Sequence, residues 1–314
     1  MSIKGTNKFF EAMISRGKSP ATSSLLHFLD EIDVSYVRDE GEVSLKEDYE
    51  FLVPELLKEY LRESGLTPPS LEVYRVATST NDIVMGKLLR GSKKDCLCLA
   101  EAQTEGKGRR GRIWVSPFGR NVYMSYGFAF KPEISRLEGL SVGVGIEVAE
   151  SLIEAGLTRV GLKWPNDLIL DQKKLGGILV EMAPTKNGST AVVVGLGINL
   201  RLSLSDAELI DQPHAVAGHG IEISRNRLIG GLALSVISAV KKCSEKGFVD
   251  YKSKWNRFNS HAGEFIRLKR ADQSISGFDK GIDAKGNLVL DINGEKKVFN
   301  SGEVDSIRRK IAPD

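Results

Sequence analysis

The segment GKGRRGR, residues 106–112, combines three glycines with four cationic side chains. Glycine leaves backbone amides accessible, and ammonium and guanidinium groups bind phosphate, so this composition suits an anion site. The segment also matches the dinucleotide pattern G-x-G-x-x-G, but that motif has to open a helix, and Pro117 and Gly119 would break one here. No Walker A string occurs in the chain. The segment is therefore either a solvated basic turn or a loop that binds a phosphate.

Three further segments place polar groups or bare backbone beside predicted strands. In KWPND, residues 163–167, proline forces a turn and presents an asparagine and an aspartate side by side. Lys174 opens a strand in which Gly176 and Gly177 let another group approach the backbone. GLGIN, residues 195–199, repeats this arrangement. Taken singly, each segment has an ordinary explanation as a turn, a surface lysine or a β-bulge.

The composition is that of an ordinary globular protein of roughly two domains. The 314 residues include 44 Lys and Arg against 41 Asp and Glu, and 41% of them are hydrophobic. This balance does not favour nucleic acid or a membrane as the main partner. The N-terminus lacks the apolar core of a signal peptide, and no apolar run is long enough to span a membrane, so we expect a cytoplasmic protein.

The three cysteines are too few for a disulfide framework. Cys96 and Cys98 alternate in an apolar run, which would place both on one face of a strand as buried thiols. Their spacing is too short for the usual zinc pairs, and the four histidines are scattered. We therefore expect no protein-bound structural metal.

Hydrophobic periodicity and capping residues predict the order of the elements. Pro54 is acceptable in the first turn of a helix, Ser79 or Thr80 is a predicted N-cap, and Ser224 is another. The N-terminal part is predicted to hold helices over 4–16 and 22–33, a hairpin over 34–45 and a helix over 54–63. A polar stretch at 64–70 with two prolines is the predicted linker. After the linker we predict helices over 79–89, 135–156 and 224–247, a polar loop at about 201–221, and strands over 72–77, 96–103, 121–130, 159–164, 174–182 and 190–200.

Several of these strands are joined by hairpins, which a doubly wound parallel sheet does not use. We therefore predict an α+β fold with a mainly antiparallel central sheet. Short strands and turns after Trp255 indicate a small β domain. The predicted organisation is an N-terminal domain at 1–66, a catalytic domain at 71–258 and a C-terminal domain at 262–314.

Together, the motifs resemble the biotin protein ligase family in their order and spacing. They are STN at 79–81, QTEGKGRRGR at 103–112, KWPND at 163–167, KLGGIL at 174–179 and GLGIN at 195–199. The resemblance covers about residues 71–314, and the combination is far more specific than any single motif. It implies a central domain related to class II aminoacyl-tRNA synthetases and lipoate protein ligases, followed by a small SH3-like β-barrel.

The resemblance also implies which residues form the site. The biotin side would be lined by Ser79, Thr80, Asn81, Gln103, Lys107, Gly108, Arg109, Lys174, Gly177, Gly195 and Gly197. The ATP or adenylate side would be lined by Arg109, Arg112, Asn166, Asp167, Asn199 and Arg308. Arg109, Lys174 and Asp167 would be the catalytic groups, and no residue is assigned to a metal.

The implied activity begins with biotin and ATP, which form biotinoyl-5′-AMP and pyrophosphate. Biotin is then transferred to a specific lysine of a biotin carboxyl carrier protein of acetyl-CoA carboxylase or a similar carboxylase. Lys174 and Arg109 would offset the charge of the carboxylate and α-phosphate, and Mg²⁺ would carry the pyrophosphate. Residues 104–112 would close over the adenylate as a lid that excludes water. Asp167 would orient or deprotonate the acceptor lysine, although a Mg²⁺ ligand would require the same residue.

Two features depart from the family's pattern. Lys107 stands where the loop often has arginine, which keeps the charge but loses bidentate geometry. The segment at about 201–221 matches poorly and contains no tryptophan, so its adenine contacts are unassigned. A lipoate-type protein ligase is the nearest alternative, since it shares the chemistry but not the pairing of GKGRRG with KWPND.

A biotin-responsive DNA-binding repressor is the alternative from another class, because some family members carry an N-terminal winged helix-turn-helix. That motif needs two helices before its hairpin, and only one fits between the first helix and residues 34–45. Residues 1–70 contain 8 Lys and Arg against 13 Asp and Glu, an excess of negative charge that repels phosphates. We expect a shortened winged-helix remnant that does not bind DNA, no membrane partner, and a chain that is compatible with a homodimer.

Overall fold

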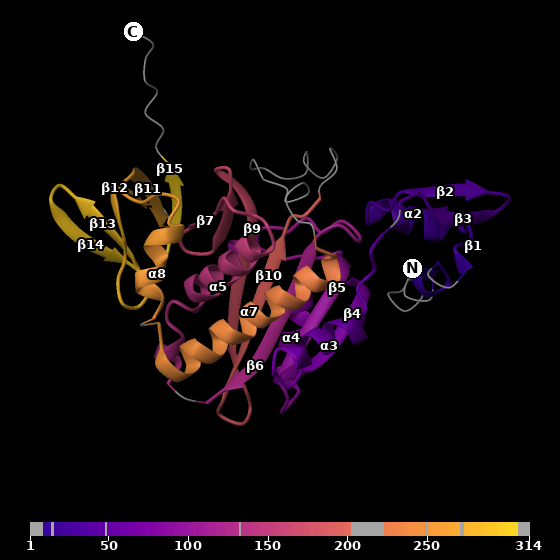
Figure 1. Ribbon diagram of the computed structural model, residues 1–314, viewed down its shortest axis with the longest axis horizontal. Helices are drawn as coiled ribbons and strands as arrows, with labels where there is room; N and C mark the ends of the chain where they lie inside the picture. Colours follow the sequence, from indigo (N-terminus) through magenta and orange to yellow (C-terminus); the bar gives the residue numbers. More distant parts are fainter. Residues whose placement is uncertain are drawn as a thin grey trace, which may run out of the picture.

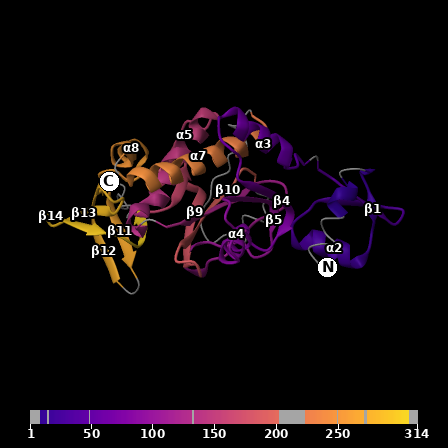
Figure 2. The same ribbon diagram turned by 90° about the horizontal axis from the view of Figure 1, so that it is seen from below.

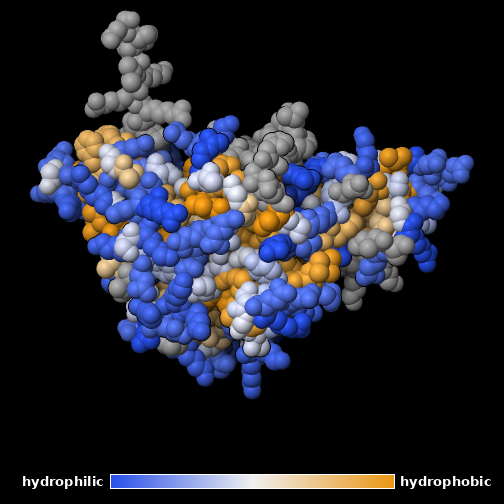
Figure 3. Space-filling model, viewed as in Figure 1, coloured by the Kyte–Doolittle hydropathy of each residue, from blue (hydrophilic) through white to orange (hydrophobic). Residues whose placement is uncertain are grey.

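The computed structural model describes residues 9–13, 16–47, 49–131, 133–201, 223–248, 250–270 and 273–306. A large central part carries a smaller N-terminal unit on one side and a small C-terminal β unit on the other (Figure 1). The face of the molecule seen in Figure 3 is mostly hydrophilic, with smaller hydrophobic areas between the polar side chains.

Seven strands form the central sheet, in the order β4-β5-β6-β10-β9-β8-β7. β4 and β5 are parallel, and the other neighbouring pairs are antiparallel. This arrangement confirms the predicted α+β class with a mainly antiparallel sheet. The strands are β4 Ser70–Ala77, β5 Cys96–Gln103, β6 Val122–Phe130, β7 Val160–Lys163, β8 Asp167–Leu170, β9 Lys173–Pro184 and β10 Thr190–Ile198.

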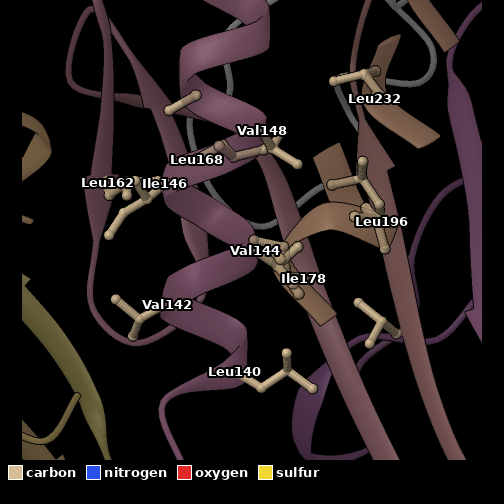
Figure 4. Packing of buried hydrophobic residues seen from close by; sticks show 14 of the residues in the cluster. Leu140, Val142, Val144, Ile146, Val148, Leu162, Leu168, Ile178, Leu196 and Leu232 are labelled. Atoms are coloured by element: carbon tan, nitrogen blue, oxygen red, sulfur yellow. The ribbon is translucent and has the colours of Figure 1, made fainter. Parts of the chain in front are cut away.

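Helices cover both faces of this sheet. The helices α3 (Pro54–Glu63), α5 (Leu140–Glu154) and α7 (Arg225–Lys246) lie on one face, and α4 (Thr80–Leu89) lies on the other (Figure 2). Alternation along β10 matches these two layers, because Val192 and Val194 share a hydrophobic cluster with α5 and α7, whereas Val193 packs with residues of α4. On the face covered by α3, α5 and α7, Val144 of α5 points toward the strands (Figure 4).

Side chains cap the starts of α4 and α7 but not those of α3 and α5. The Ser79 side chain accepts the backbone N–H of Asp82 at the start of α4, and Ser224 begins α7 in the same way, as predicted. The helix predicted to begin at 135 begins at Leu140. Gly139 has a left-handed φ of 74°, which prevents the helix from extending further toward the N-terminus. The helix α8 (Tyr251–Phe258) was not predicted. No helix among the described residues is long and apolar enough to cross a membrane.

The N-terminal unit consists of a short helical stretch at residues 9–13, the helix α2 (Ser23–Glu31) and a three-stranded sheet. The sheet is formed by β1 (Ser19–Pro20), β2 (Tyr36–Asp39) and β3 (Glu42–Leu45). One helix, α2, lies between the helical stretch at 9–13 and the hairpin, as predicted. The unit packs against the central part through Phe118, whose ring stacks on Phe10 at a centroid distance of 4.1 Å.

The helix α3 precedes the predicted linker in the chain but packs with the central part. Leu57 and Leu61 are buried in the same hydrophobic cluster as α7 and the sheet. The domain limits of 1–66, 71–258 and 262–314 stay a prediction, and this packing favours grouping α3 with the catalytic part.

The C-terminal unit is an antiparallel sheet in the order β14-β13-β12-β11-β15. Its strands are β11 Phe265–Arg270, β12 Gln273–Ile282, β13 Leu288–Ile292, β14 Glu295–Phe299 and β15 Glu303–Ser306. Within the described residues the pairing ends at β14 and β15 and does not close a barrel. The indole N–H of Trp164 donates to the backbone oxygen of Gly286 at 2.9 Å, which joins this unit to the turn after β7.

Candidate active site

A cavity of about 580 Å³ lies on the α4 face of the central sheet, a volume typical of small-molecule sites. It is bounded by the N-terminal end of α4, the end of β5, residues 107–115 and the strands β6, β9 and β10. The predicted site residues that line it are Ser79, Thr80, Asn81, Gln103, Lys107, Gly108, Arg109, Arg112, Asn166, Lys174, Gly177, Gly195, Gly197 and Asn199. Asp167 does not line the cavity but contacts Lys174, and Arg308 lies outside the described residues.

Strand register explains why glycines form the floor of the cavity. Gly177 of β9 pairs with Gly197 of β10, so two bare backbones lie side by side on the same face. A Cβ atom at Gly195 would lie 2.3 Å from the Asn81 side chain, and one at Gly197 would lie 2.6 Å from the Trp114 ring. Protein contacts therefore require glycine at these two positions. The nearest atoms to a Cβ at Gly177 would belong to Lys174 and Asp167 at ordinary distances of 3.6 Å or more, so a small side chain would fit there and would project toward the cavity that Gly177 lines.

One end of the cavity consists of neutral polar groups. The Gln103 side-chain oxygen accepts the Thr80 backbone N–H at 2.9 Å, and the Gln103 amide donates to Ser116 Oγ at 3.1 Å. Ser125 Oγ lies 2.7 Å from Thr80 Oγ1 and 2.5 Å from Asn81 Oδ1. These contacts fix the amide and hydroxyl groups in single orientations, as recognition of a neutral polar ring requires.

Glu181 of β9 extends this network at its edge. Its carboxylate accepts the Asn81 Nδ2 hydrogen bond at 2.7 Å, which settles the orientation of the Asn81 amide. The neighbouring Asp82 binds Lys107 Nζ at 2.7 and 2.6 Å through its two oxygens. The hydrogen bond to Asp82 raises the pKa of Lys107 above its usual value.

The opposite end of the cavity is cationic. Lys174 Nζ lies 2.8 Å from Asp167 Oδ1 and 5.6 Å from the centre of the Trp114 ring. Arg109 donates to Asn166 Oδ1 at 2.8 Å, and burial lowers the pKa of the Arg109 guanidinium below its ordinary value. An ammonium and a guanidinium group at the same end of a cavity can hold a carboxylate and a phosphate together.

The segment at 104–112 is a short hairpin that contacts three other elements. Gly108 N donates to Arg112 O at 2.7 Å, and Trp114 N donates to Gly106 O at 2.8 Å. Lys107 binds α4 and Arg109 binds the turn before β8, as described above. Arg112 forms an ion pair with Glu303 of β15, so the loop also connects to the C-terminal unit. These contacts are compatible with the predicted lid.

Several apolar residues that line the cavity were not predicted from the sequence, namely Ile113, Trp114, Val115, Tyr123, Met124, Ile178, Leu179 and Leu196. Trp114 is the most informative of them, because its indole nitrogen is buried and has no hydrogen-bond partner within the described part of the chain. A tryptophan five residues after Arg109 was visible in the sequence, but its position over Gly197 depends on the distant strand β10.

Comparisons with known proteins agree with this geometry. Residues 73–199 match the biotin/lipoate A/B protein ligase family, and residues 261–305 match the biotin protein ligase C-terminal domain. The bifunctional ligase/repressor BirA of Escherichia coli is 34% identical over 236 residues, which cover 75% of this chain and 73% of that protein. The chain belongs to the biotin protein ligase family. This confirms the resemblance inferred from the motifs.

Other members of the biotin protein ligase family align over similar lengths. The biotin acetyl-CoA-carboxylase ligase of Mycobacterium tuberculosis is 28% identical over 264 residues, covering 80% of this chain and 94% of that protein. The solved biotin protein ligase from Aquifex aeolicus in complex with biotin and ATP has a TM-score of 0.62 and 26% identity, and the match covers 76% of this chain and 99% of that chain.

Proposed function

We propose that this chain is an ATP-dependent biotin protein ligase. It activates biotin with ATP as biotinoyl-5′-AMP, releases pyrophosphate, and transfers biotin to a lysine of a carrier protein. The observation that carries this proposal is the polarity of the cavity, with neutral amides and hydroxyls at one end and Lys174 and Arg109 at the other. Biotin has the matching polarity, with a neutral ureido ring and an anionic carboxylate.

The neutral end suits the ureido ring. Thr80, Asn81 and Gln103 offer amide and hydroxyl groups, with Ser79 at the start of the same helix. The unpartnered Trp114 N–H supplies a further buried donor that a bound ligand would satisfy. Gly108, Gly177, Gly195 and Gly197 leave the space that the ring and the aliphatic chain would occupy. The Lys107 ammonium would border this end of the site.

The cationic end suits the activation step. A carboxylate oxygen of biotin attacks the α-phosphorus of ATP, a new P–O bond forms, and the bond to pyrophosphate breaks. Lys174 and Arg109 would lower the repulsion between the two anions and stabilise the charge that moves onto the leaving pyrophosphate. Arg112, Asn166 and Asn199 would face the nucleotide. Arg308 is assigned to the same side from the sequence alone.

Mg²⁺ is proposed to enter with ATP. The described residues contain no group of three or more His, Cys, Asp or Glu side chains that could hold a metal ion. Asp167 is the carboxylate beside this end of the cavity, and it is paired with Lys174. A Mg²⁺ ion bound with ATP would neutralise phosphate charge during activation, and Asp167 would be a carboxylate able to contribute to holding it if the pair with Lys174 opened.

In the transfer step the lysine amine of the carrier attacks the carbonyl carbon of the adenylate. The new amide bond forms, AMP leaves, and the amine loses a proton. We propose that Asp167 contributes mainly by holding Lys174, because their atoms are 2.8 Å apart. Accepting the amine proton would require this ion pair to open first.

We propose a biotin carboxyl carrier protein of acetyl-CoA carboxylase, or of a similar carboxylase, as the acceptor. Two of the matched relatives carry acetyl-CoA carboxylase in their names, which supports this choice. A homodimer stays a prediction, which sedimentation of the purified chain would decide.

Pyrophosphate exchange tests the proposed activation step. The protein should catalyse exchange of labelled pyrophosphate into ATP when biotin is present, and lipoate should not replace biotin. Exchange that depends on lipoate and not on biotin would assign the chain to the lipoate-type alternative.

A further inference from the structure

Transfer of biotin requires the acceptor protein to approach the opening of the cavity. In the proposed reaction the acyl carbon lies near Lys174 and Arg109, inside the cavity, while the acceptor lysine belongs to a separate folded protein. A lysine side chain reaches only about 6 Å from its backbone. The surface of the acceptor must therefore contact the residues around the opening when transfer occurs.

Ile113 is an apolar side chain that lines the cavity and is also exposed to solvent. It borders the cavity, yet 82% of its surface is exposed, the largest value among the exposed large hydrophobic residues of the described chain. Its backbone pairs with Lys107 across the hairpin. A single exposed isoleucine elsewhere would have no special meaning, because folded proteins expose many apolar atoms. At this position, however, an approaching acceptor would remove it from water.

The charges around Ile113 indicate the chemistry of the acceptor surface. The hairpin carries Lys107, Arg109, Arg110 and Arg112. Among the described residues, Lys107 pairs with Asp82, Arg110 and Arg112 both pair with Glu303, and Arg109 donates to the neutral Asn166 side chain. The excess positive charge would attract acidic side chains and repel a basic surface.

We infer that Ile113 is a contact residue for the carrier protein. It packs against an apolar position next to the target lysine, and acidic side chains of the carrier face Arg110 and Arg112. This inference rests on the proposed transfer to a carrier lysine and adds the surface that receives the carrier.

Three variants test the contact: Ile113→Ser, Ile113→Leu and Ile134→Ser. Ile134 is a matched control, since it is also an exposed isoleucine, at 45%, but lies outside the cavity lining. Initial rates are measured against the concentration of a purified biotin carboxyl carrier domain at saturating biotin and MgATP. Pyrophosphate exchange against biotin concentration is measured in parallel, because it does not involve the carrier.

With Ile113→Ser, the KM for the carrier should rise about five- to tenfold, which corresponds to ~1.0–1.4 kcal/mol at ~1.4 kcal/mol per decade. The KM for biotin in exchange should rise less than the KM for the carrier does. Ile113→Leu retains the apolar area and should restore the carrier KM, and Ile134→Ser should behave like the wild type.

Two results would overturn the inference. One is an unchanged carrier KM in Ile113→Ser, and the other is a biotin KM that rises as much as the carrier KM, which would make Ile113 a contact for biotin. Failure of the proposed function would look different, since the wild-type protein itself would then transfer no biotin to the carrier.

Discussion

The ion pair between Lys107 and Asp82 connects two walls of the cavity, the glycine-rich hairpin and the first turn of α4. Both side chains are partly exposed, so we expect a modest contribution that salt screens. Asp82→Asn should speed biotin dissociation by roughly two- to fivefold at low salt and have little effect in ~1 M NaCl. Stopped-flow dissociation measures this, with Glu55→Gln, which affects a surface pair on α3, as the control. Equal rates of biotin dissociation from Asp82→Asn and from the wild type at low salt would contradict this prediction.

The pH dependence of this pair follows from the Lys107 pKa, which the hydrogen bond to Asp82 raises above 10.5. A raised pKa means that the contribution to stability is fully present below pH 10.5 and is lost as the pH rises through the higher, folded-state value. Lys107 should therefore stay protonated between pH 7 and 9, and its titration should not change the rate of biotin dissociation from the wild type in this range.

The substitutions Arg109→Gly and Lys174→Ala should impair different steps of the reaction. Arg109 lies in the hairpin and binds Asn166, so Arg109→Gly should retain the fold and lose a charge-assisted phosphate contact of about 2–3 kcal/mol. The adenylate should then escape roughly 30- to 150-fold faster and label bystander lysines. Lys174→Ala should instead depress pyrophosphate exchange more strongly than Arg109→Gly does. Equal exchange rates, with unchanged bystander labelling, would show that these roles are wrong.

At the scale of elements, α3 packs with the central part although it precedes the linker predicted at residues 64–70. Leu61 is fully buried against the central cluster, whereas Leu56 on the same helix is 50% exposed. Leu61→Ala should lower the free energy of unfolding by about 2–4 kcal/mol, and Leu56→Ala should change it by less than about 0.5 kcal/mol. Chemical denaturation compares the two, and similar losses would argue against the packing of α3.

The same packing revises an expectation about truncation. The catalytic motifs all lie after Leu71, so the sequence by itself predicts that residues 1–64 are dispensable for biotinylation. Removing them would also remove Leu57 and Leu61 from the central cluster and the backbone contact of Leu52 with the buried Glu101 carboxylate. We therefore expect this truncation to destabilise the catalytic part.

Local signals predicted most elements, and long-range contacts account for what was missed. Proline at the start of α3 and serine before α7 marked helix ends correctly. The helix α8 has only eight residues, and its apolar positions, Tyr251, Trp255 and Phe258, were hidden among charges. In the site, glycines and cations were visible as motifs, whereas Trp114 was not, because its place depends on pairing between strands distant in sequence.

At the scale of the whole molecule, the N-terminal unit determines whether the ligase also binds DNA in a sequence-specific manner. The matched relatives include proteins named bifunctional ligase/repressor. Here one helix lies between β1 and the hairpin, and residues 1–70 carry more acidic than basic side chains. We predict no sequence-specific DNA binding by the full-length chain. A sequence-selective gel shift at nanomolar protein that resists salt would refute this.

Biotinylation of a carrier by the intact chain tests the proposed ligase activity. A purified biotin carboxyl carrier domain is incubated with the protein, biotin and MgATP, and its mass is measured. We expect one added biotin on a single lysine, with AMP and pyrophosphate released in equal amounts, and no addition when ATP or biotin is left out. A carrier of unchanged mass, together with no biotin-dependent pyrophosphate exchange, would show that the protein is not a biotin protein ligase.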